Sequence, residues 1–348
     1  MEAIDNTLKA QYEALKKEEP RLRAKQAAEK LGVTEAEVTQ VFPNAIPLKP
    51  EFQNILNDVT TLGNVMALTR NNDVVHERKG TYLNPELDNP HVGLFVGADI
   101  DLRIFFHCWK YAFALKSDEK GKASNGILFF SKDGSAIHKI YLTPTSDYAA
   151  FNALVEKYKQ EEAYDIVPEA LPEKAKEVAD SEIDVENFRN EWVNLKDTHH
   201  FFGMLKKYGV TRTQALHLAP EGDYAIELSN NALREIITKA SEEKVEIMVF
   251  VGNPGMIQIH TGPVNNLMDH ENWFNVIDPI FNLHVNEPAI AQSWVVRKPT
   301  EDGIVTALEV YDEAGELIVQ LFGKRKPGIP ELESWRAIVK TVEDQLKK

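Results

Sequence analysis

One pattern occurs twice in this sequence, and it constrains the fold more than any other feature. Gly32-Val33-Thr34 recurs as Gly209-Val210-Thr211, at an offset of 177 residues, and each tripeptide separates two segments with helical spacing of apolar residues. Downstream the offsets stay between about 177 and 184 residues at these pairs: His76 with His260, Arg103 with His284, and Gly134 with Gly315. The chain is therefore expected to be a tandem duplication of one structural unit.

Each copy predicts a helical module followed by antiparallel strands. Thr34 and Glu37 form the pattern of a capping box, which predicts a helix start. After Pro50, segments of alternating apolar residues predict an antiparallel meander, and residues 131–134 (SKDG) predict a hairpin turn with Gly134 at a positive φ. The expected fold is α+β, with two large stacked antiparallel sheets and a helical module in each half.

The same comparison predicts the domain organisation. Residues 1–160 form the expected N-terminal repeat and residues 184–348 the C-terminal repeat. Residues 161–183 are acidic and contain Pro168 and Pro172, a composition typical of an exposed linker.

Composition narrows the classes of function. With 54 acidic and 39 basic residues, the formal net charge of −15 disfavours nucleic acid as a partner. No run of about 18 apolar residues predicts a membrane span, and the N-terminal segment lacks the apolar core of a signal peptide. The only cysteine, Cys108, lies in an apolar segment and is expected to be packed in the core. A soluble cytoplasmic protein is predicted, without membrane insertion.

Positions where the two copies differ are candidates for a site that exists once. At the offset of 177, Leu22 lies opposite His199 and Glu35 opposite Arg212. A single helix over this region would set the imidazole beside apolar side chains, namely Trp192, Leu195, Phe202 and Leu205. Neutral imidazole in such surroundings suits an axial ligand of haem iron.

An ordinary core or surface histidine is the alternative interpretation of His199, and the adjacent His200 leaves the assignment open by one position. Other chemistries have less support. The sequence contains no HExxH or CxxC metal motif, no phosphate-binding glycine loop and no GxSxG elbow.

Several long blocks of the sequence resemble the HemS/ChuS/HmuS haem-utilisation family, often called hemin-degrading factors. The blocks are LGNVMALTRNNDVVHERKG, DLRIFFHCWKYAFAL, DTHHFFGMLKKYGVTRTQA, SWVVRKPTEDGIVTALEVYDEAG and QLFGKRKPG, and together they span nearly the whole chain. The resemblance implies a duplicated α+β fold with two large antiparallel sheets, which agrees with the repeat.

The resemblance also implies roles for single residues. The histidine of the family's D-x-H-x-F-F motif is the proximal haem ligand and falls on His199. The arginine of the DLR motif reaches the distal side of the haem, which makes Arg103 the candidate catalytic residue, and Phe105 lines the pocket. Arg212 would pair with a haem propionate. Further pocket positions fall on Phe250, Lys298, Gln320 and Arg325.

The sequence leaves two questions about the haem site, one about residue 322 and one about His76. Some family members carry tyrosine where this chain has Phe322, so any hydrogen bond of that hydroxyl is in doubt here. His76 is a candidate for a second, weaker haem site in the first half. Because His260 recurs opposite it, a structural role is the alternative.

Haem is thus the expected ligand or substrate, and two classes of function remain. The chain would either degrade haem oxidatively and release iron, or act as a haem chaperone that stores haem or passes it to a downstream acceptor. No flavin or nicotinamide motif is present, so degradation would need an external electron donor. Arg103 would serve either function, by ordering bound oxygen or by shielding the iron.

Overall fold

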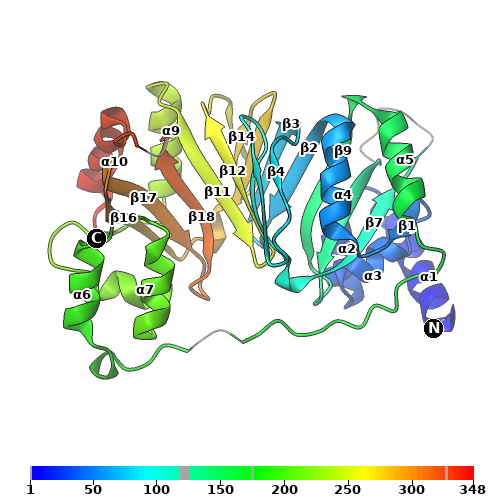
Figure 1. The fold of residues 1–348 in the computed structure, drawn as a ribbon, viewed down its shortest axis with the longest axis horizontal. Coiled ribbons are helices and arrows are strands. Elements are labelled where there is room, and N and C mark those ends of the chain that lie inside the picture. The colour runs from blue at the N-terminus through cyan, green and yellow to red at the C-terminus, as the bar shows by residue number, and fades with distance from the viewer. Residues whose placement is uncertain (1, 118–124, 174–175, 326–327) are drawn as a thin grey trace. The chain divides into compact units, whose positions relative to one another are not determined.

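The computed structural model describes residues 2–117, 125–173, 176–325 and 328–348. The chain forms two compact units (Figure 1). The first comprises residues 1–70, 76–172 and 252–258, and the second comprises residues 71–75, 173–251 and 259–348. The strands belong to two nine-stranded sheets in which the paired strands are antiparallel, so the predicted α+β class with two large sheets is confirmed.

The helices of the first unit are a small module before the strands and a pair that packs together. They are α1 (Glu2–Glu18), α2 (Ala24–Leu31), α3 (Glu35–Gln40), α4 (Phe52–Val59) and α5 (Tyr148–Tyr158). The predicted capping box starts α3: Thr34 Oγ1 accepts from the backbone N–H of Glu37, and the Glu37 carboxylate accepts from the N–H of Thr34. This local chemistry explains why α3 begins where the sequence predicts.

The strands of the first unit fall into two groups. They are β1 (Ala45–Leu48), β2 (Gly63–Arg70), β3 (Val74–Gly80), β4 (Pro85–Glu86), β5 (Val92–Val96), β6 (Asp101–Phe105), β7 (Trp109–Leu115), β8 (Gly126–Ser131) and β9 (Ala136–Ser146). Neighbours run β1-β7-β8-β9-β2-β3 in one sheet and β6-β5-β4 in the other.

The prediction of a simple meander was wrong between β6 and β7. These strands belong to different sheets and are separated by a 3₁₀ turn at Phe106–Cys108. In this turn the ring of Phe106 packs on the first residue of the next strand, with the rings of Phe106 and Trp109 5.4 Å apart. Cys108 is buried, as predicted, and burial raises the pKa of its thiol.

The predicted hairpin between β8 and β9 has the expected geometry. Gly134 has a φ of +80°, a conformation that favours glycine. Its carbonyl accepts from the N–H of Ala36 at 3.0 Å, and a Cβ at this position would lie 2.4 Å from Thr34 Cβ. The hairpin turn therefore packs directly on the start of α3.

The second unit repeats this order of elements. Its helices are α6 (Val185–Val193), α7 (His200–Tyr208), α8 (Arg212–His217), α9 (Ala232–Glu242) and α10 (Glu333–Leu346). Its strands are β10 (Ala225–Leu228), β11 (Ile247–Asn253), β12 (Met256–Gly262), β13 (Leu267–His270), β14 (Trp273–Ile277), β15 (Phe281–Asn286), β16 (Gln292–Thr300), β17 (Gly303–Tyr311) and β18 (Leu317–Gly323). Neighbours run β10-β16-β17-β18-β11-β12 and β15-β14-β13. Among the described residues, no helix has the length and apolar character needed to cross a membrane.

The repeat extends to the helix caps. Gly32 and Gly209 end α2 and α7 with φ of 68° and 65°, and Thr34 and Thr211 start α3 and α8 with side-chain caps. At the second hairpin Gly315 has a φ of +72°, and a Cβ there would lie 3.3 Å from Thr213 Oγ1. The predicted duplication is therefore visible in backbone conformation as well as in strand order.

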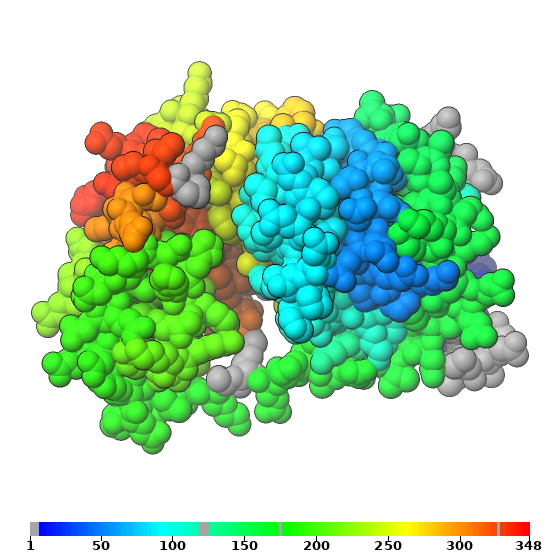
Figure 2. Space-filling model, viewed as in Figure 1, coloured from blue at the N-terminus to red at the C-terminus, as the bar shows by residue number. Residues whose placement is uncertain are grey.

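A separate apolar cluster joins α6, α7 and α8 to one face of β16 and β17. Its largest members are the buried side chains Phe188, Trp192, Phe201, Trp294 and Tyr311. The indole Nε1 of Trp192 donates to the carbonyl of Arg297 at 3.0 Å. Figure 2 shows this helical module in green, as part of the surface of the second unit. The module is thus held on the sheet by packing and by hydrogen bonds.

The segment predicted to be an exposed linker is partly docked. Tyr164 is half-buried, donates from its hydroxyl to the carbonyl of Leu48, and exchanges two hydrogen bonds with the Gln40 side chain. Further along, Glu177 accepts from Thr211 Oγ1 at 2.8 Å. The expectation of an exposed connection was therefore wrong at Tyr164, because its aromatic ring and backbone find partners on the first unit.

Candidate functional site

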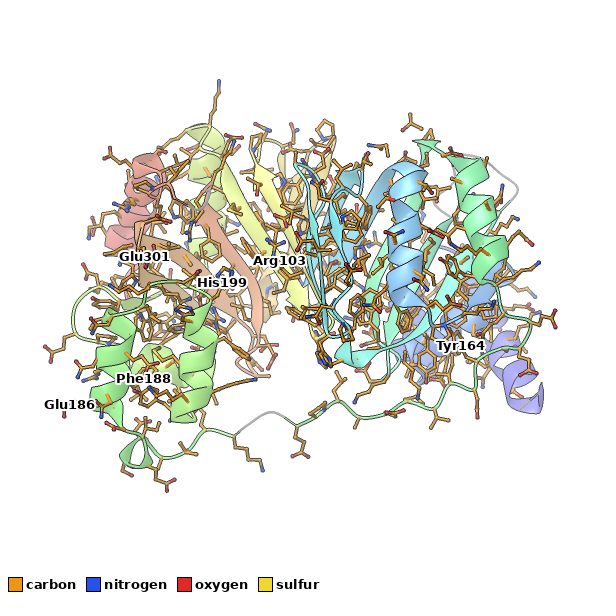
Figure 3. All side chains as sticks on the ribbon, viewed as in Figure 1. Arg103, Tyr164, Glu186, Phe188, His199 and Glu301 are labelled. Carbon is orange, nitrogen blue, oxygen red and sulfur yellow. The ribbon has the colours of Figure 1, made fainter. Side chains whose placement is uncertain are left out.

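His199 lies just before α7 (Figure 3). Its imidazole is exposed and held by a carboxylate. Its side chain is 88% exposed. Asp197 Oδ1 accepts from the backbone N–H of His199 at 2.8 Å and lies 2.6 Å from its Nδ1. Since an ionised carboxylate only accepts, Nδ1 donates in this contact, and in the neutral imidazole Nε2 is then the nitrogen with the free lone pair. The arrangement suits a metal ligand that binds through Nε2.

The carboxylate that holds the imidazole is itself stabilised as an anion. The backbone N–H of His199 is the main cause that lowers the pKa of Asp197, and the imidazole contributes further. Sequence reasoning assigned no role to Asp197, although the D-x-H part of the motif contains it.

The expectation of one helix through this region was wrong. α6 ends at Val193 and α7 begins at His200, so His199 lies in the connection between two helices. Trp192 is buried and Phe202 is 61% exposed, which places them in different surroundings. The imidazole therefore does not lie within an apolar helical stripe. Asp197 favours a turn at this point, because its side chain accepts from the N–H two residues on, that of His199.

A buried carboxylate on the sheet contacts the first residue of α8. Glu309, on β17, has no exposed surface in its side chain. Arg212 approaches it with two donors, Nε at 2.9 Å from Oε2 and Nη2 at 2.7 Å from Oε1. Lys298 Nζ and Gln320 Nε2 donate to Oε1 at 2.6 and 3.0 Å, and the hydroxyl of Tyr311 donates to Oε2. The predicted residues Arg212, Lys298 and Gln320 are thus brought together by a residue that sequence reasoning missed.

The charges of this cluster shift one another's pKa values. Burial alone would raise the pKa of Glu309, but Arg212 and Lys298 outweigh it and hold that pKa far below its usual range. Burial lowers the pKa of Lys298 to about 8, with the attraction of Glu309 opposing and the repulsion of Arg212 adding to this shift. A charge within the apolar alternation of residues 303–311 was the one indication of Glu309 in the sequence.

Phe201 connects the cluster to the histidine. Its buried ring lies 4.3 Å from Lys298 Nζ and 5.8 Å from Arg212 Cζ, measured to the ring centroid. It is the second residue after His199 and packs on Trp192 at a centroid distance of 4.7 Å. The buried charges therefore contact an aromatic residue that lies two positions after the exposed histidine in the chain.

The sheet beside the cluster offers a half-buried aromatic surface. Phe250 and Gln320 are directly opposite each other on β11 and β18, and the rings of Phe250 and Phe322 lie 4.9 Å apart. All three side chains are half-buried. Arg325 follows the end of β18, is also half-buried, and has no ion pair among the described residues. The strand that carries Phe322 and Gln320 is therefore followed closely by a cation.

The candidate residues of the first unit lie on β6. Arg103 pairs with Asp101 and also donates from Nη1 to the carbonyl of Leu102 at 3.1 Å. Its side chain is 35% exposed, and Figure 3 labels its place in the fold. Burial raises the pKa of Asp101, and Arg103 opposes that shift. Phe105 ends β6, is half-buried, and donates from its N–H to the carbonyl of Gly255.

His76 and His260 are both buried on equivalent strands. His76 Nδ1 lies 3.2 Å from the carbonyl oxygen of Gln258, and the ring of His260 stacks on Phe281 at 3.6 Å. The burial of both copies favours the structural role over a second haem site, because a ligand would have to displace packed side chains to reach either ring.

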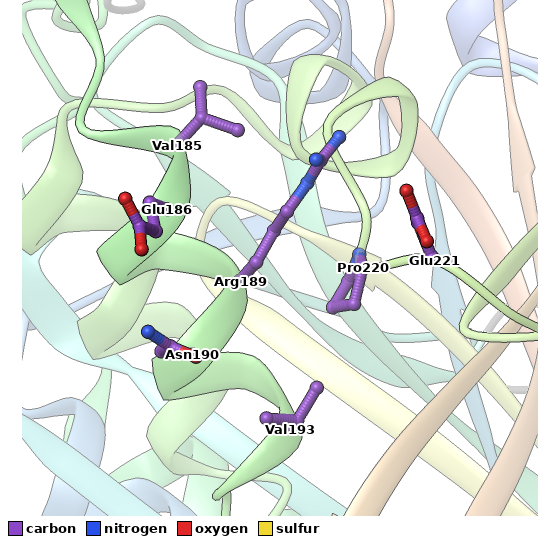
Figure 4. A pocket seen from close by; sticks show the side chains of 7 residues that line it. All are labelled: Val185, Glu186, Arg189, Asn190, Val193, Pro220 and Glu221. Atoms are coloured by element: carbon purple, nitrogen blue, oxygen red, sulfur yellow. The ribbon is translucent and has the colours of Figure 1, made fainter.

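A surface depression in the second unit lies against α6 and lacks the candidate residues (Figure 4). It is lined by Val185, Glu186, Arg189, Asn190, Val193, Pro220 and Glu221. The guanidinium Nε of Arg189 donates to the carbonyl of Leu218 there. Within the described ranges no three His, Cys, Asp or Glu side chains are grouped as a metal site. Such a group supplies at least three ligands, so its absence there does not bear on an iron atom that is bound by one protein side chain, such as His199.

The family model of the haemin-degrading HemS/ChuX domain matches residues 30–158 and again residues 209–342. The chain belongs to this family. The two matches lie within the two copies found in the sequence, so each copy of this HemS/ChuX chain matches the same domain type.

Two curated relatives cover almost the whole chain. The hemin transport proteins HmuS of Yersinia pestis and HemS of Yersinia enterocolitica are each 37% identical to it, over 96% of both chains.

Solved structures agree with this assignment. PhuS of Pseudomonas aeruginosa, a heme-binding protein solved in apo and holo forms, is 43% identical, with a TM-score of 0.92 over 97% of this chain and 99% of PhuS. The heme degrading enzyme ChuS of Escherichia coli O157:H7 is 33% identical, with a TM-score of 0.89 over 97% of this chain and 99% of ChuS. Members of the family with the same overall fold therefore include proteins named for binding and for degrading heme.

Proposed function

We propose that the chain is a haem-binding protein that holds haem iron through His199 Nε2. The observation that carries this proposal is the exposed imidazole whose Nδ1 is held by Asp197, in a HemS/ChuX chain closely similar to a heme-binding protein. The carboxylate orients the ring and increases its basicity, as partners of metal-bound histidines commonly do.

The remaining parts of haem have matching partners in the second unit. The macrocycle is apolar and suits the rings of Phe250 and Phe322, with Gln320 beside them. The two propionates suit cations. Arg212 directs Nε and Nη2 to Glu309, which leaves Nη1 for a second anion, and Arg325 and Lys298 are the other proposed partners.

In the first unit, Arg103 and Phe105 remain proposed haem-binding residues on the strength of the family resemblance. Arg103 is also the proposed catalytic residue. Its guanidinium is paired with Asp101, which holds the arginine as an oriented donor.

We propose oxidative degradation of haem, with release of iron, as the activity. The similarity to ChuS, named as a heme degrading enzyme, supports it, and an external reductant would supply electrons. The alternative is a carrier that passes haem to an acceptor protein, which the names of the two Yersinia hemin transport proteins favour. In either case the proposed location is the cytoplasm.

The deciding experiment is anaerobic reconstitution with haem, followed by O₂ and a physiological reductant in the presence of catalase. Sustained conversion to an open-chain tetrapyrrole with release of iron is expected for the enzyme. Bleaching that occurs only when catalase is left out would support the carrier, because peroxide would then be the oxidant. A matched Arg103→Ala protein separates the contribution of that residue from the rest.

A further inference from the structure

Glu309, on β17, is a charge with no exposed side-chain surface that contacts the first residue of α8. Five hydrogen bonds from four side chains converge on its two oxygens, and two of the four, Arg212 and Lys298, are cations. A carboxylate with no exposed surface is costly unless it is paired in this way. Removing one charge from such a group leaves the others buried and unpaired, so the local structure depends on Glu309.

The cluster is connected to the proposed iron ligand by side-chain contacts as far as Phe201, and from there by the backbone of α7. Arg212 is the first residue of α8, and Lys298 lies on β16. Both cations face the buried ring of Phe201, which belongs to the first turn of α7. His199 immediately precedes that helix. A displacement of Arg212 or Lys298 would therefore displace the start of α7 and the imidazole with it.

The first unit contains the same kind of ion cluster with the charges exchanged. There Glu35, the first residue of α3, pairs with Arg70 and Lys139 on the sheet. At the offset of 177 residues Glu35 corresponds to Arg212, and at the offset of 181 residues Lys139 corresponds to Gln320. Both units thus fasten the start of a short helix to the sheet by a buried ion cluster. Only the second unit has a histidine at the position of Leu22.

We propose that Glu309 is a positioning residue for haem binding. Through Arg212 and Lys298 it holds Phe201 and the first turn of α7 against the sheet, and this fixes the position of the His199 imidazole. The inference rests on the proposed function, because it takes His199 as the iron ligand. It adds a residue on the sheet that acts on the iron ligand His199 through the helical module, without contacting haem.

The test compares Glu309→Gln with Glu35→Gln, which breaks the corresponding cluster in the unit that lacks the histidine. Each purified full-length variant is titrated with haem while the Soret band is recorded, and the apo-proteins are melted by circular dichroism. Both variants are expected to melt several degrees below wild type. Glu309→Gln alone is expected to bind haem about tenfold or more weakly, with an altered Soret band, since loss of an indirect support of a ligand typically has this size.

Tyr311→Phe is the milder second variant, which keeps the inference testable where Glu309→Gln does not fold. Its hydroxyl donates to Glu309, and the corresponding residue of the first unit is Phe130, so the fold accepts phenylalanine at this position. A smaller change of haem affinity and Soret band in the same direction is expected. Wild-type affinity and spectrum in Tyr311→Phe would contradict a positioning role.

Three other outcomes are decisive. Glu309→Gln with the melting temperature lowered but wild-type haem binding would show that Glu309 is only structural. Equal loss of haem affinity in Glu35→Gln would assign the effect to general stability. If Glu309 acts through His199, Glu309→Gln has little further effect in a His199→Ala background, and a full additional loss there would overturn the inference.

Failure of wild-type protein to bind haem, or unchanged binding in His199→Ala, would instead refute the proposed function.

Discussion

Asp197 Oδ1 lies 2.6 Å from His199 Nδ1 and also accepts the backbone N–H of His199 at 2.8 Å. One carboxylate oxygen therefore sets both the turn before α7 and the orientation of the imidazole. We predict that Asp197→Asn weakens haem binding about 10- to 100-fold, because an amide neither carries the charge nor reliably accepts from Nδ1. Haem titration followed at the Soret band measures this change.

Asp184→Asn is the matched control, because Asp184 caps α6 of the same module through the N–H of Asn187 and has no contact to an imidazole. It is expected to leave haem affinity near wild type. Equal effects of the two substitutions would show that helix capping, and not support of His199, explains the result.

His199→Leu is expected to abolish high-affinity haem binding while leaving the fold intact. The imidazole is 88% exposed, so its removal should change the free energy of unfolding by about 0.5 kcal/mol or less. The corresponding residue in the first unit is Leu22, which shows that the fold accepts leucine here. Circular dichroism, thermal melting and haem titration of the same preparation check both parts.

His200→Ala is the control for this assignment, because it alters the adjacent ring and keeps the Asp197 contact. Its haem affinity and Soret band should remain near wild type. A larger loss in His200→Ala than in His199→Leu would place the ligand one residue later. An unfolded His199→Leu protein would show that His199 is a structural residue.

The two helix caps provide a comparison between the repeats. Thr34→Ala and Thr211→Ala each remove a side-chain acceptor at a helix start, and each is expected to cost about 1 kcal/mol of unfolding free energy. Only Thr211→Ala should also weaken haem binding, because α8 carries Arg212 at its first position. Urea unfolding and haem titration of both variants measure these effects, and reduced haem affinity in Thr34→Ala would refute the distinction.

Features set by neighbouring residues could be predicted from the sequence. The capping box at Thr34, the positive φ of Gly134 and the recurrence of that glycine as Gly315 depend on local backbone chemistry, and all were confirmed. Family resemblance added His199, which spacing alone could not separate from His200.

Features set by distant pairing could not be predicted in this way. The change of sheet between β6 and β7 depends on which strands pair, and a run of apolar residues does not encode that choice. Glu309 is similar: its role follows from Arg212, which is 97 residues earlier, and from Lys298 on the adjacent strand. A single acidic residue in an apolar strand indicates a buried partner without identifying it.

The pKa of Lys298 leads to a prediction of how stability depends on pH. Burial lowers this pKa from 10.5 to about 8, although Glu309 opposes the shift. Between these values the unfolded chain binds the proton and the folded protein has released it. The free energy of unfolding therefore rises with pH across this interval, by up to about 3 kcal/mol from this group at about 1.4 kcal/mol per unit.

Lys298→Met removes that contribution while keeping an unbranched apolar side chain over Phe201. The difference in unfolding free energy, wild type minus variant, should become more positive between pH 8 and pH 10.5 and stay constant below pH 7. Lys340→Met is the control, because this lysine is exposed and Asp344 raises its pKa, so its substitution should give no rise over the same interval. Urea titrations at several pH values provide the measurement. A flat difference for Lys298→Met would mean that the ammonium stays charged beside Glu309 throughout, and that Glu309 stabilises it more strongly than burial penalises it.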